Sequence, residues 1–383
     1  MRTGFVAAFS SAVLVGTGIA GAQTVRGVVM DGAQHPVTGV VVLMLDSASN
    51  VVARGLSGEQ GDFHVAAARS GAYRLRTMRI GYRSTISQPI ALLAGGEVNQ
   101  RLVLSGVSVS LDTVRIVDRG SCRISSDLAS ATFEAWEQAR TALIAAQLTA
   151  GGRAITATTV TYDRALEPDG RRVTQQASRI HTDYVTHPWR APAADSLHRA
   201  GYVVTERDNT TTYRAPGIDV LLSAVFVEDH CFHLIADAAR PGTVGIAFEP
   251  SPERKRVPEI RGTLWVDRRT AELRRLDYRY VNVSSEQESA GAGGEMSFAR
   301  FANGGWAIAS WSIRMPVLEQ SMRTQQFGGT QTHVAEIKVS GGELALATIQ
   351  SARGRDTLWS RPPLVLAGTV VDSASGAAVA GAH

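Results

Sequence analysis

The sequence lacks the short motifs that accompany common catalytic sites. Its 383 residues contain no G-x-S-x-G nucleophile elbow, no Walker A loop, no H-E-x-x-H zinc pair and no dinucleotide-binding fingerprint. The carboxylates Glu286 and Glu288 fall in a polar, glycine-containing stretch from 284 to 294, which is typical of a solvated loop. The sequence therefore predicts no catalytic residue, no metal ligand and no cofactor, although a triad assembled from distant residues remains open.

An excess of charge of one sign is also missing. The chain has 39 Lys and Arg against 35 Asp and Glu, a formal net charge of +4. The basic residues are scattered along the chain and form no stripe of the kind that tracks a phosphate backbone. We therefore predict that nucleic acid is not a partner.

Cysteine is scarce, with Cys122 and Cys231 as the two examples. In an oxidising compartment such a pair predicts a disulfide, which would contribute about 4–5 kcal/mol in the chain-entropy model. Two unrelated buried thiols are the alternative. His230 and His233 flank Cys231, but in a strand-like run neighbouring side chains point in different directions, so we expect no metal site there.

Long apolar runs are absent after the first 22 residues. Phe5 to Ala20 is apolar or small without charge, it follows Arg2, and Ala20-Gly21-Ala22 is typical of a cleavage site. Residues 1–22 therefore predict a signal peptide, with an uncleaved anchor helix as the alternative. The mature chain is expected in the periplasm or at the outer membrane or cell surface.

Residues 23–106 have the pattern of a small β-sandwich. Short β-branched runs alternate with turn residues, and Gly71-Ala72-Tyr73-Arg74-Leu75-Arg76 alternates apolar and basic side chains as a half-buried strand does. Six or seven such strands over about eighty residues are typical of a sandwich of the transthyretin or immunoglobulin type.

The order of motifs in this region carries a family resemblance. It comprises Gly27, Asp31, Pro36 and Gly39-Val40, then Gly61-Asp62-Phe63, Gly71-x-Tyr73-x-Leu75, Gly81-Tyr82 and Leu102-x-Leu104. This set resembles the carboxypeptidase regulatory-like domain, although Gly58 stands where that family usually has Asp or Asn. The resemblance implies a module for interaction or spacing, without catalytic residues.

The remainder of the chain predicts a second, larger β domain. Residues 107–120 are expected to be a linker, or a last strand, and residues 121–362 to form one helix followed by strands. Phe133, Trp136 and Leu143 have helical spacing, whereas the stretches from 153 to 360, Val220 to Leu234 among them, have strand patterns. We predict a mainly β protein whose large, curved antiparallel sheet packs the helix on its concave side.

Two further stretches suggest relatives. Gly262 to Leu273 weakly resembles the outer-membrane lipoprotein carrier and sorting half-barrel, which implies a concave face able to hold an acyl chain or a lipoprotein segment. Gly368-Thr369-Val370-Val371-Asp372 repeats the pattern of Gly27 to Asp31. Residues 363–383 are therefore predicted to begin a second regulatory-like domain, cut short at His383.

Three functional hypotheses follow. The first is a non-enzymatic envelope protein, associated with the outer membrane, that binds an envelope protein or a lipid. The second is a carbohydrate-binding protein that uses Tyr82, Trp306 or Trp311 to stack on the sugars of a polysaccharide. The third is a hydrolase or a peptidase-associated protein. Nothing in the sequence predicts an oligomeric state.

Overall fold

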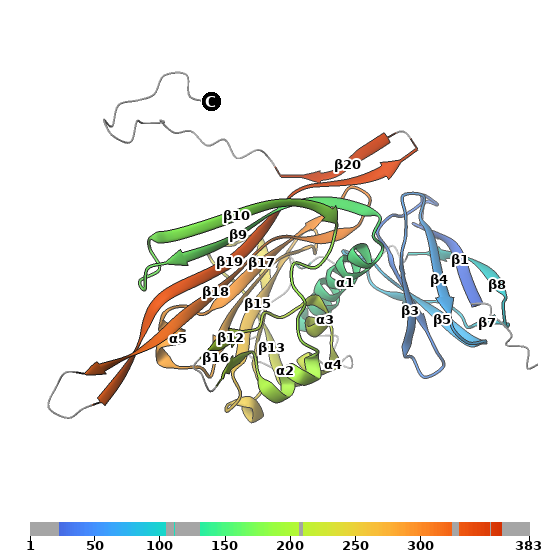
Figure 1. Cartoon of the computed structure of the whole chain (residues 1–383). Coiled ribbons are helices and arrows are strands. Elements are labelled where there is room, and N and C mark those ends of the chain that lie inside the picture. The colour runs from blue at the N-terminus through green and yellow to red at the C-terminus, as the bar shows by residue number, and fades with distance from the viewer. Residues whose placement is uncertain are drawn as a thin grey trace, which may run out of the picture. The chain divides into compact units, whose positions relative to one another are not determined.

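The protein forms two compact units, residues Met1–Ser108 and Val109–His383, each described here by itself (Figure 1). A computed structural model describes residues 23–104, 111, 131–206, 210–323, 329–352 and 354–361. The predicted signal peptide, the predicted truncated repeat at 363–383 and the predicted linker apart from Leu111 lie outside these residues.

The first unit consists of two sheets that face each other across one core. One sheet has the order β4-β1-β8, and the other has the order β3-β2-β5-β6 with β7 also paired to β5. The strands are β1 (Gln23–Met30), β2 (Val41–Leu45), β3 (Val51–Leu56), β4 (Asp62–Ala67), β5 (Gly71–Met78), β6 (Thr85–Ile86), β7 (Ile90–Leu92) and β8 (Glu97–Val103).

The sequence of these strands explains their positions. All five residues of β2 are buried, and β4 alternates exposed and buried side chains, as central and half-covered strands do. Gly61 adopts φ +72°, and a Cβ there would lie 2.5 Å from the carbonyl oxygen of Val29, so the turn before β4 requires glycine. The small sandwich predicted for this region is therefore confirmed.

The second unit is built on a ten-stranded antiparallel sheet. Its order is β10-β9-β19-β18-β17-β16-β15-β14-β13, with β20 also paired to β19. The strands are β9 (Ile155–Leu166), β10 (Val173–Tyr184), β13 (His230–Ile235), β14 (Thr243–Pro250), β15 (Glu259–Asp267), β16 (Leu273–Val281), β17 (Gly293–Arg300), β18 (Trp306–Arg323), β19 (Gly329–Ser351) and β20 (Gly354–Ser360). A separate hairpin pairs β11 (Val203–Thr205) with β12 (Thr211–Tyr213).

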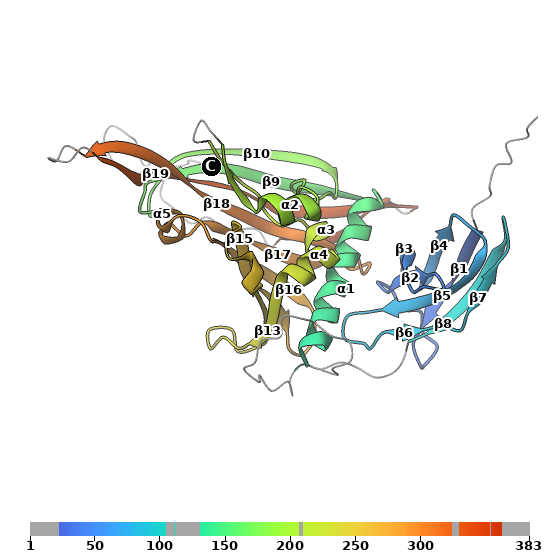
Figure 2. The same ribbon diagram turned by 90° about the horizontal axis from the view of Figure 1, so that it is seen from below.

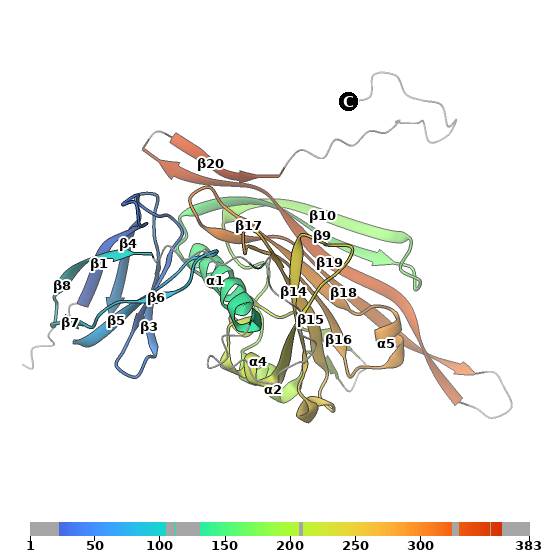
Figure 3. The same cartoon turned by 180° about the vertical axis from the view of Figure 1, so that it is seen from behind.

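The sheet curves around a layer of helices (Figures 2 and 3). We call the helix-bearing side the concave face and the opposite side the convex face. The helices of this unit are α1 (Ala131–Gly151), α2 (Ala194–Ala200), α3 (Ile218–Leu221), α4 (Ala224–Asp229) and α5 (Ser285–Ser289), with a short 3-10 helix, η1 (Pro252–Arg254). The first four lie on the concave face, where Trp136 of α1 packs on Phe232 of β13 with ring centroids 5.3 Å apart. The predicted helix on a curved antiparallel sheet is confirmed.

Residues 220–234 differ from the prediction of a continuous strand. They form the end of α3, all of α4 and only then β13. Ser223 caps α4, because its hydroxyl accepts a hydrogen bond from Phe226 N at 3.1 Å, and this local bond outweighs the β-branched composition. Glu286 and Glu288 likewise lie in a helix, α5, whose Ser284 and Gln287 form a capping box.

Leu111 belongs to the second unit. Its amide donates to the carbonyl of Arg268 at 3.0 Å, and its side chain is fully buried. Within the described ranges, no helix combines the length and the apolar character needed to cross a membrane.

Candidate functional site

Two adjoining hollows lie on the concave face, beneath the segment that joins β10 to α2. The larger, about 690 Å³, has a mainly apolar lining that includes Ile218, Val220 and Ile308. The smaller, about 150 Å³, is lined largely by side chains with hydroxyl, carboxylate or aromatic groups. Both hollows include His187 and Ile308, so we treat them as one concave groove.

Two tryptophans meet where the hollows adjoin. Trp189 lines the larger hollow and Trp311 of β18 lines the smaller, and their ring centroids lie 5.4 Å apart at an interplanar angle of 58°. Both indole Nε1 atoms are shielded from solvent, and neither has a hydrogen-bond partner in the part of the chain described. A buried donor without an acceptor costs about 1–3 kcal/mol. Because Trp311 Nε1 packs against Gly342, where a Cβ would lie 2.9 Å from it, a ligand oxygen would reach this donor only after the ring turns toward the hollow.

The chemistry changes along the concave groove. Thr159, Thr161 and Asp183 bring polar groups to the smaller hollow. At the shared boundary, burial lowers the pKa of His187 below its usual range, although Asp219 acts in the opposite direction. The imidazole is therefore neutral at neutral pH. The groove thus joins an apolar hollow to a polar one that contains hydroxyl and carboxylate groups.

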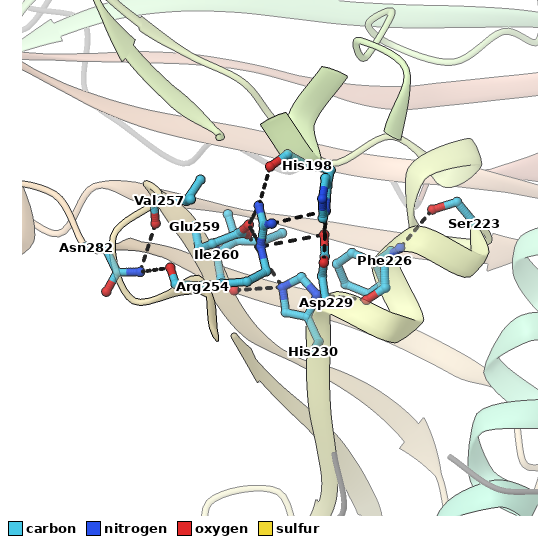
Figure 4. A network of polar contacts seen from close by, with 10 residues as sticks. All are labelled: His198, Ser223, Phe226, Asp229, His230, Arg254, Val257, Glu259, Ile260 and Asn282. Carbon is cyan, nitrogen blue, oxygen red and sulfur yellow. Dashed lines mark hydrogen bonds and ion pairs between the residues drawn. The ribbon is translucent and has the colours of Figure 1, made fainter. Parts of the chain in front are cut away.

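A buried charged network lies where the short helices meet the sheet (Figure 4). Its centre is Arg254 of η1, whose side chain is only 7% exposed. Arg254 Nε donates to Glu259 Oε1 at 2.5 Å, and Nη2 donates to the carbonyl of His198 at 2.8 Å. Asp229 completes the cluster, 3.6 Å from Arg254 Nε and 2.9 Å from His198 Nδ1.

This network joins four elements that are separate in the sequence. His198 comes from α2, Asp229 from the end of α4, and Glu259 from the start of β15. Asn282 adds two bonds, because its Nδ2 donates to the carbonyls of Arg254 at 3.2 Å and Val257 at 2.8 Å. The charged groups therefore fix the short helices to the sheet, since neither helix is long enough to be stable alone.

His230 and Glu259 show how strongly the site is desolvated. Burial lowers the pKa of His230 to about 4, and burial also raises the pKa of Glu259 against the opposing effect of Arg254. The ring of His230 contacts the carbonyls of Phe226 at 2.8 Å and Ile260 at 3.2 Å. The neutral imidazole therefore serves as a packed polar core residue.

The network does not have the arrangement of a nucleophile and base. The side-chain hydrogen bonds of His198 go to Asp229 and Arg254, with no hydroxyl or thiol among these partners. Across the described residues, no cluster of three or more His, Cys, Asp or Glu side chains could hold a metal ion. The geometry of this network therefore supports a role in holding the short helices on the sheet.

A comparison with protein-family models identifies the first unit. Residues 24–105 match the carboxypeptidase regulatory-like domain. These residues form a regulatory-like domain. The match covers the region in which the glycine and aromatic motifs predict it. None of the curated proteins matches the chain in sequence.

Two solved structures are distantly similar to this chain. A DUF1329 family protein from Desulfovibrio piger is 9% identical, with a TM-score of 0.27, over 58% of this chain and 94% of that one. A protein from Bacteroides uniformis described as a candidate carbohydrate binding protein is 8% identical, with a TM-score of 0.19, over 60% and 90%. At these scores the similarities carry no argument about fold or function.

The three aromatic residues predicted to stack on sugars have different surroundings. Trp306 is 2% exposed, so its ring is closed to a ligand, and this part of the prediction is wrong. In the regulatory-like domain, the half-buried Tyr82 has the guanidinium of Arg79 at 5.1 Å from its ring centroid, which occupies one face. Trp311 lines the smaller hollow of the concave groove.

Cys231 is buried in β13. Cys122 lies outside the described residues, so the disulfide between them stays a prediction.

Sequence reasoning missed Trp189 and Arg254. Trp189 follows a proline in a stretch without periodicity. Arg254 lies in a polar turn, and the chain has many other arginines from which the sequence does not distinguish it. The dipeptide Pro188-Trp189 next to an exposed strand is the one signal that could have singled out the loop over the groove.

Proposed function

We propose that the protein is a non-catalytic binding protein of the cell envelope, and that its second unit holds an amphipathic ligand with an acyl chain in the concave groove. The observation that carries this proposal is the Trp189–Trp311 pair, with two unpartnered indole donors between an apolar and a polar hollow. Ligand sites commonly combine a mostly apolar concave surface with a few orienting polar groups.

The two hollows suit the two ends of such a ligand. The larger is bordered by Ile218, Val220 and Ile308, which can cover a hydrocarbon chain. The smaller offers the hydroxyls of Thr159 and Thr161 to the oxygen atoms of a head group, beside the ring of Trp311. Burial of the acyl chain in the larger hollow and hydrogen bonds to the head group in the smaller one would then both stabilise the complex.

The cellular setting of this proposal comes from the sequence. Residues 1–22 have the pattern of an export signal, and the regulatory-like domain at 24–105 is suited to a binding or spacing role. We therefore place the mature chain in the periplasm or at the outer membrane, with an envelope protein as the partner of the regulatory-like domain.

The proposal is tested by recovering the protein from the periplasm of expressing cells, extracting it with organic solvent and measuring lipids by mass spectrometry. We expect bound lipid with the wild-type chain, at least tenfold less with Trp311→Ala, and an intermediate amount with Trp311→Phe, which keeps an aromatic ring but removes the donor. Ile180→Ala is the matched control, because Ile180 is 73% exposed on β10 and contributes to neither hollow.

A carbohydrate ligand is the second candidate, favoured by the hydroxyl and aromatic lining of the smaller hollow. Aromatic side chains present large apolar faces beside polar groups, as sugar recognition requires. A protein that is free of lipid but retained on a polysaccharide column, with retention lost in Trp311→Ala, would replace the lipid proposal by this one. An empty protein without retention would contradict both.

A further inference from the structure

A hollow of about 610 Å³ lies on the convex face, opposite the concave groove. Its position follows from strand alternation, because the odd-numbered residues of β15 from Arg261 to Trp265 face away from the buried Ile260 and Leu264. It is lined by five arginines, which come from several strands and the loop after β13: Arg240, Arg261, Arg275, Arg279 and Arg314.

Strand register places three of these arginines in one row. Arg261 of β15 is directly opposite Arg279 of β16, Arg279 is opposite Gly293 of β17, and Gly293 is opposite Arg314 of β18. Residues opposite each other in an antiparallel pair share a face, and like charges in that position are destabilising. The row therefore concentrates positive charge on one face, and the cross-strand pair of Arg261 and Arg279 is repulsive.

The carboxylates near the hollow do not neutralise this row. Asp277 and Glu295 both pair with Arg275, and Asp277 also pairs with Arg240 at 3.3 Å. Glu249 borders the hollow too, but in the described residues no ion pair joins any carboxylate to Arg261, Arg279 or Arg314. Arg314 is half-buried, and burial lowers the pKa of its guanidinium without a compensating anion.

Two arginines of the row lie near Gly291, and Arg314 is also bound to the backbone there, because its Nε donates to the carbonyl of Ala290 at 2.8 Å. Gly291 has φ +73°, and a Cβ there would lie 3.6 Å from Arg314 Nε and 4.0 Å from Arg279 Nη1. Gly293 lies between the two arginines in the row, where the strands pack so closely that a Cβ would lie 2.3 Å from the carbonyl oxygen of Tyr278. Both arginines therefore border the hollow on the side where Gly291 and Gly293 line it.

We propose that this convex hollow binds a dianionic phosphate group, either free phosphate or a monoester, held by Arg279 and Arg314 with Arg261 beside them. A phosphate monoester carries close to two negative charges near neutral pH, and arginine binds such groups through paired N–H donors. A compact dianion fits better than a long polyanion, because Glu249, Asp277 and Glu295 on the same face would repel an extended chain. This site is separate from the concave groove and does not depend on its ligand.

The test is equilibrium binding of three probes to the full-length mature chain at constant ionic strength: inorganic phosphate, glucose 6-phosphate, and vesicles of phosphatidylcholine with one fifth phosphatidic acid. Isothermal titration serves for the soluble probes and co-sedimentation for the vesicles. We expect binding of at least one probe, with affinity reduced tenfold or more in Arg279→Gln and in Arg314→Gln. The probe that binds most tightly identifies the source of the group as free phosphate, a sugar phosphate or a lipid.

Arg274→Gln is the matched control, because Arg274 lies on β16 with Arg279 but does not line the hollow. Its binding should equal that of the wild-type chain. Arg279 is exposed and lacks a carboxylate partner in the described structure, so its substitution should leave the fold intact, which circular dichroism would verify. Absence of binding to all three probes, or equal binding by Arg279→Gln and wild type, would overturn the proposal, as would tighter binding of a DNA oligonucleotide than of every phosphate probe.

Discussion

The two faces of the ten-stranded sheet use charge in opposite ways. On the concave side, Arg254 is buried and each of its partners, Asp229, Glu259 and His198, is in place. On the convex side, Arg261 and Arg279 are exposed opposite each other without a carboxylate between them. The buried charge of Arg254 is therefore compensated, whereas the positive charges of Arg261 and Arg279 face solvent without a carboxylate partner among the described residues.

This difference follows from the cost of desolvation. An ion removed from water without partners is destabilised by several kcal/mol, so a buried arginine must be surrounded by acceptors. An exposed arginine keeps its hydration and tolerates a like-charged neighbour at a cost of well under 1 kcal/mol. The concave network therefore supports the fold, and the convex row is free to serve a ligand.

The largest expected effect comes from removing the charge on the concave side. Arg254→Ala leaves Asp229 and Glu259 buried without their cation, and we expect a loss of about 3–5 kcal/mol in the free energy of unfolding. Urea unfolding monitored by tryptophan fluorescence measures it. Arg274→Ala is the comparison on the surface, where its ion pairs with Glu272 at 3.0 Å and Asp267 at 3.4 Å should contribute below about 1 kcal/mol. Equal losses in the two variants would contradict the contrast between buried and exposed charge.

A second effect is a pH dependence that originates on the concave side. The pKa of His230 is about 4 in the folded protein against 6.5 for the unperturbed side chain. The unfolded chain therefore binds more protons between these values, and the free energy of unfolding should fall by about 3 kcal/mol as the pH drops from 6.5 to 4. Urea unfolding at pH 7 and at pH 4.5 measures most of this change.

The contribution of His230 is isolated by substitution. His230→Gln cannot titrate, so its stability should change less with pH than that of the wild-type chain, while His181→Gln on the exposed strand β10 should behave as wild type. Glu259 acts in the other direction, because a carboxyl whose pKa is raised by burial loses stability as the pH rises above its unfolded value. A wild-type slope retained in His230→Gln would assign the pH dependence to other groups.

The smallest effect is expected on the convex side. Without phosphate, Arg279→Gln removes one member of a like-charged cross-strand pair, so the free energy of unfolding should rise by a few tenths of a kcal/mol, roughly the lower end of such pair energies. Thermal unfolding at low ionic strength measures it. The gain should shrink at 1 M salt, where screening acts over about 3 Å. A loss of stability at low salt would mean that Arg279 has a structural role.

The sequence predicted the elements that depend on local pattern. Alternation from Arg274 to Tyr280 predicted a half-buried strand, and β16 confirms it. The turn glycines predicted the first sandwich. The helices α3 and α4 were missed, because Val220, Val225 and Val227 favour strands and only the Ser223 cap indicates a helix.

The candidate sites depend on register, which local pattern does not encode. Arg261, Arg279 and Arg314 become neighbours only through the pairing of four strands. Trp189 and Trp311 likewise meet because a loop crosses the concave face, so one tryptophan was predicted as a binding residue and the other was not. The prediction that Trp306 binds a ligand is wrong for a simpler reason, because its side chain is part of the core beneath α1. Its amide donates to Thr149 Oγ1 of that helix at 3.0 Å.

The network around Arg254 also has a consequence for the order of folding. The contact of Arg254 with His198 spans 56 positions in the chain, and that of His198 with Asp229 spans 31. Closing such loops carries an entropic cost before any ionic contact can form. The short helices are therefore expected to dock last, onto strands already paired, so that a weakened Arg254 network would speed unfolding while leaving the rate of refolding almost unchanged.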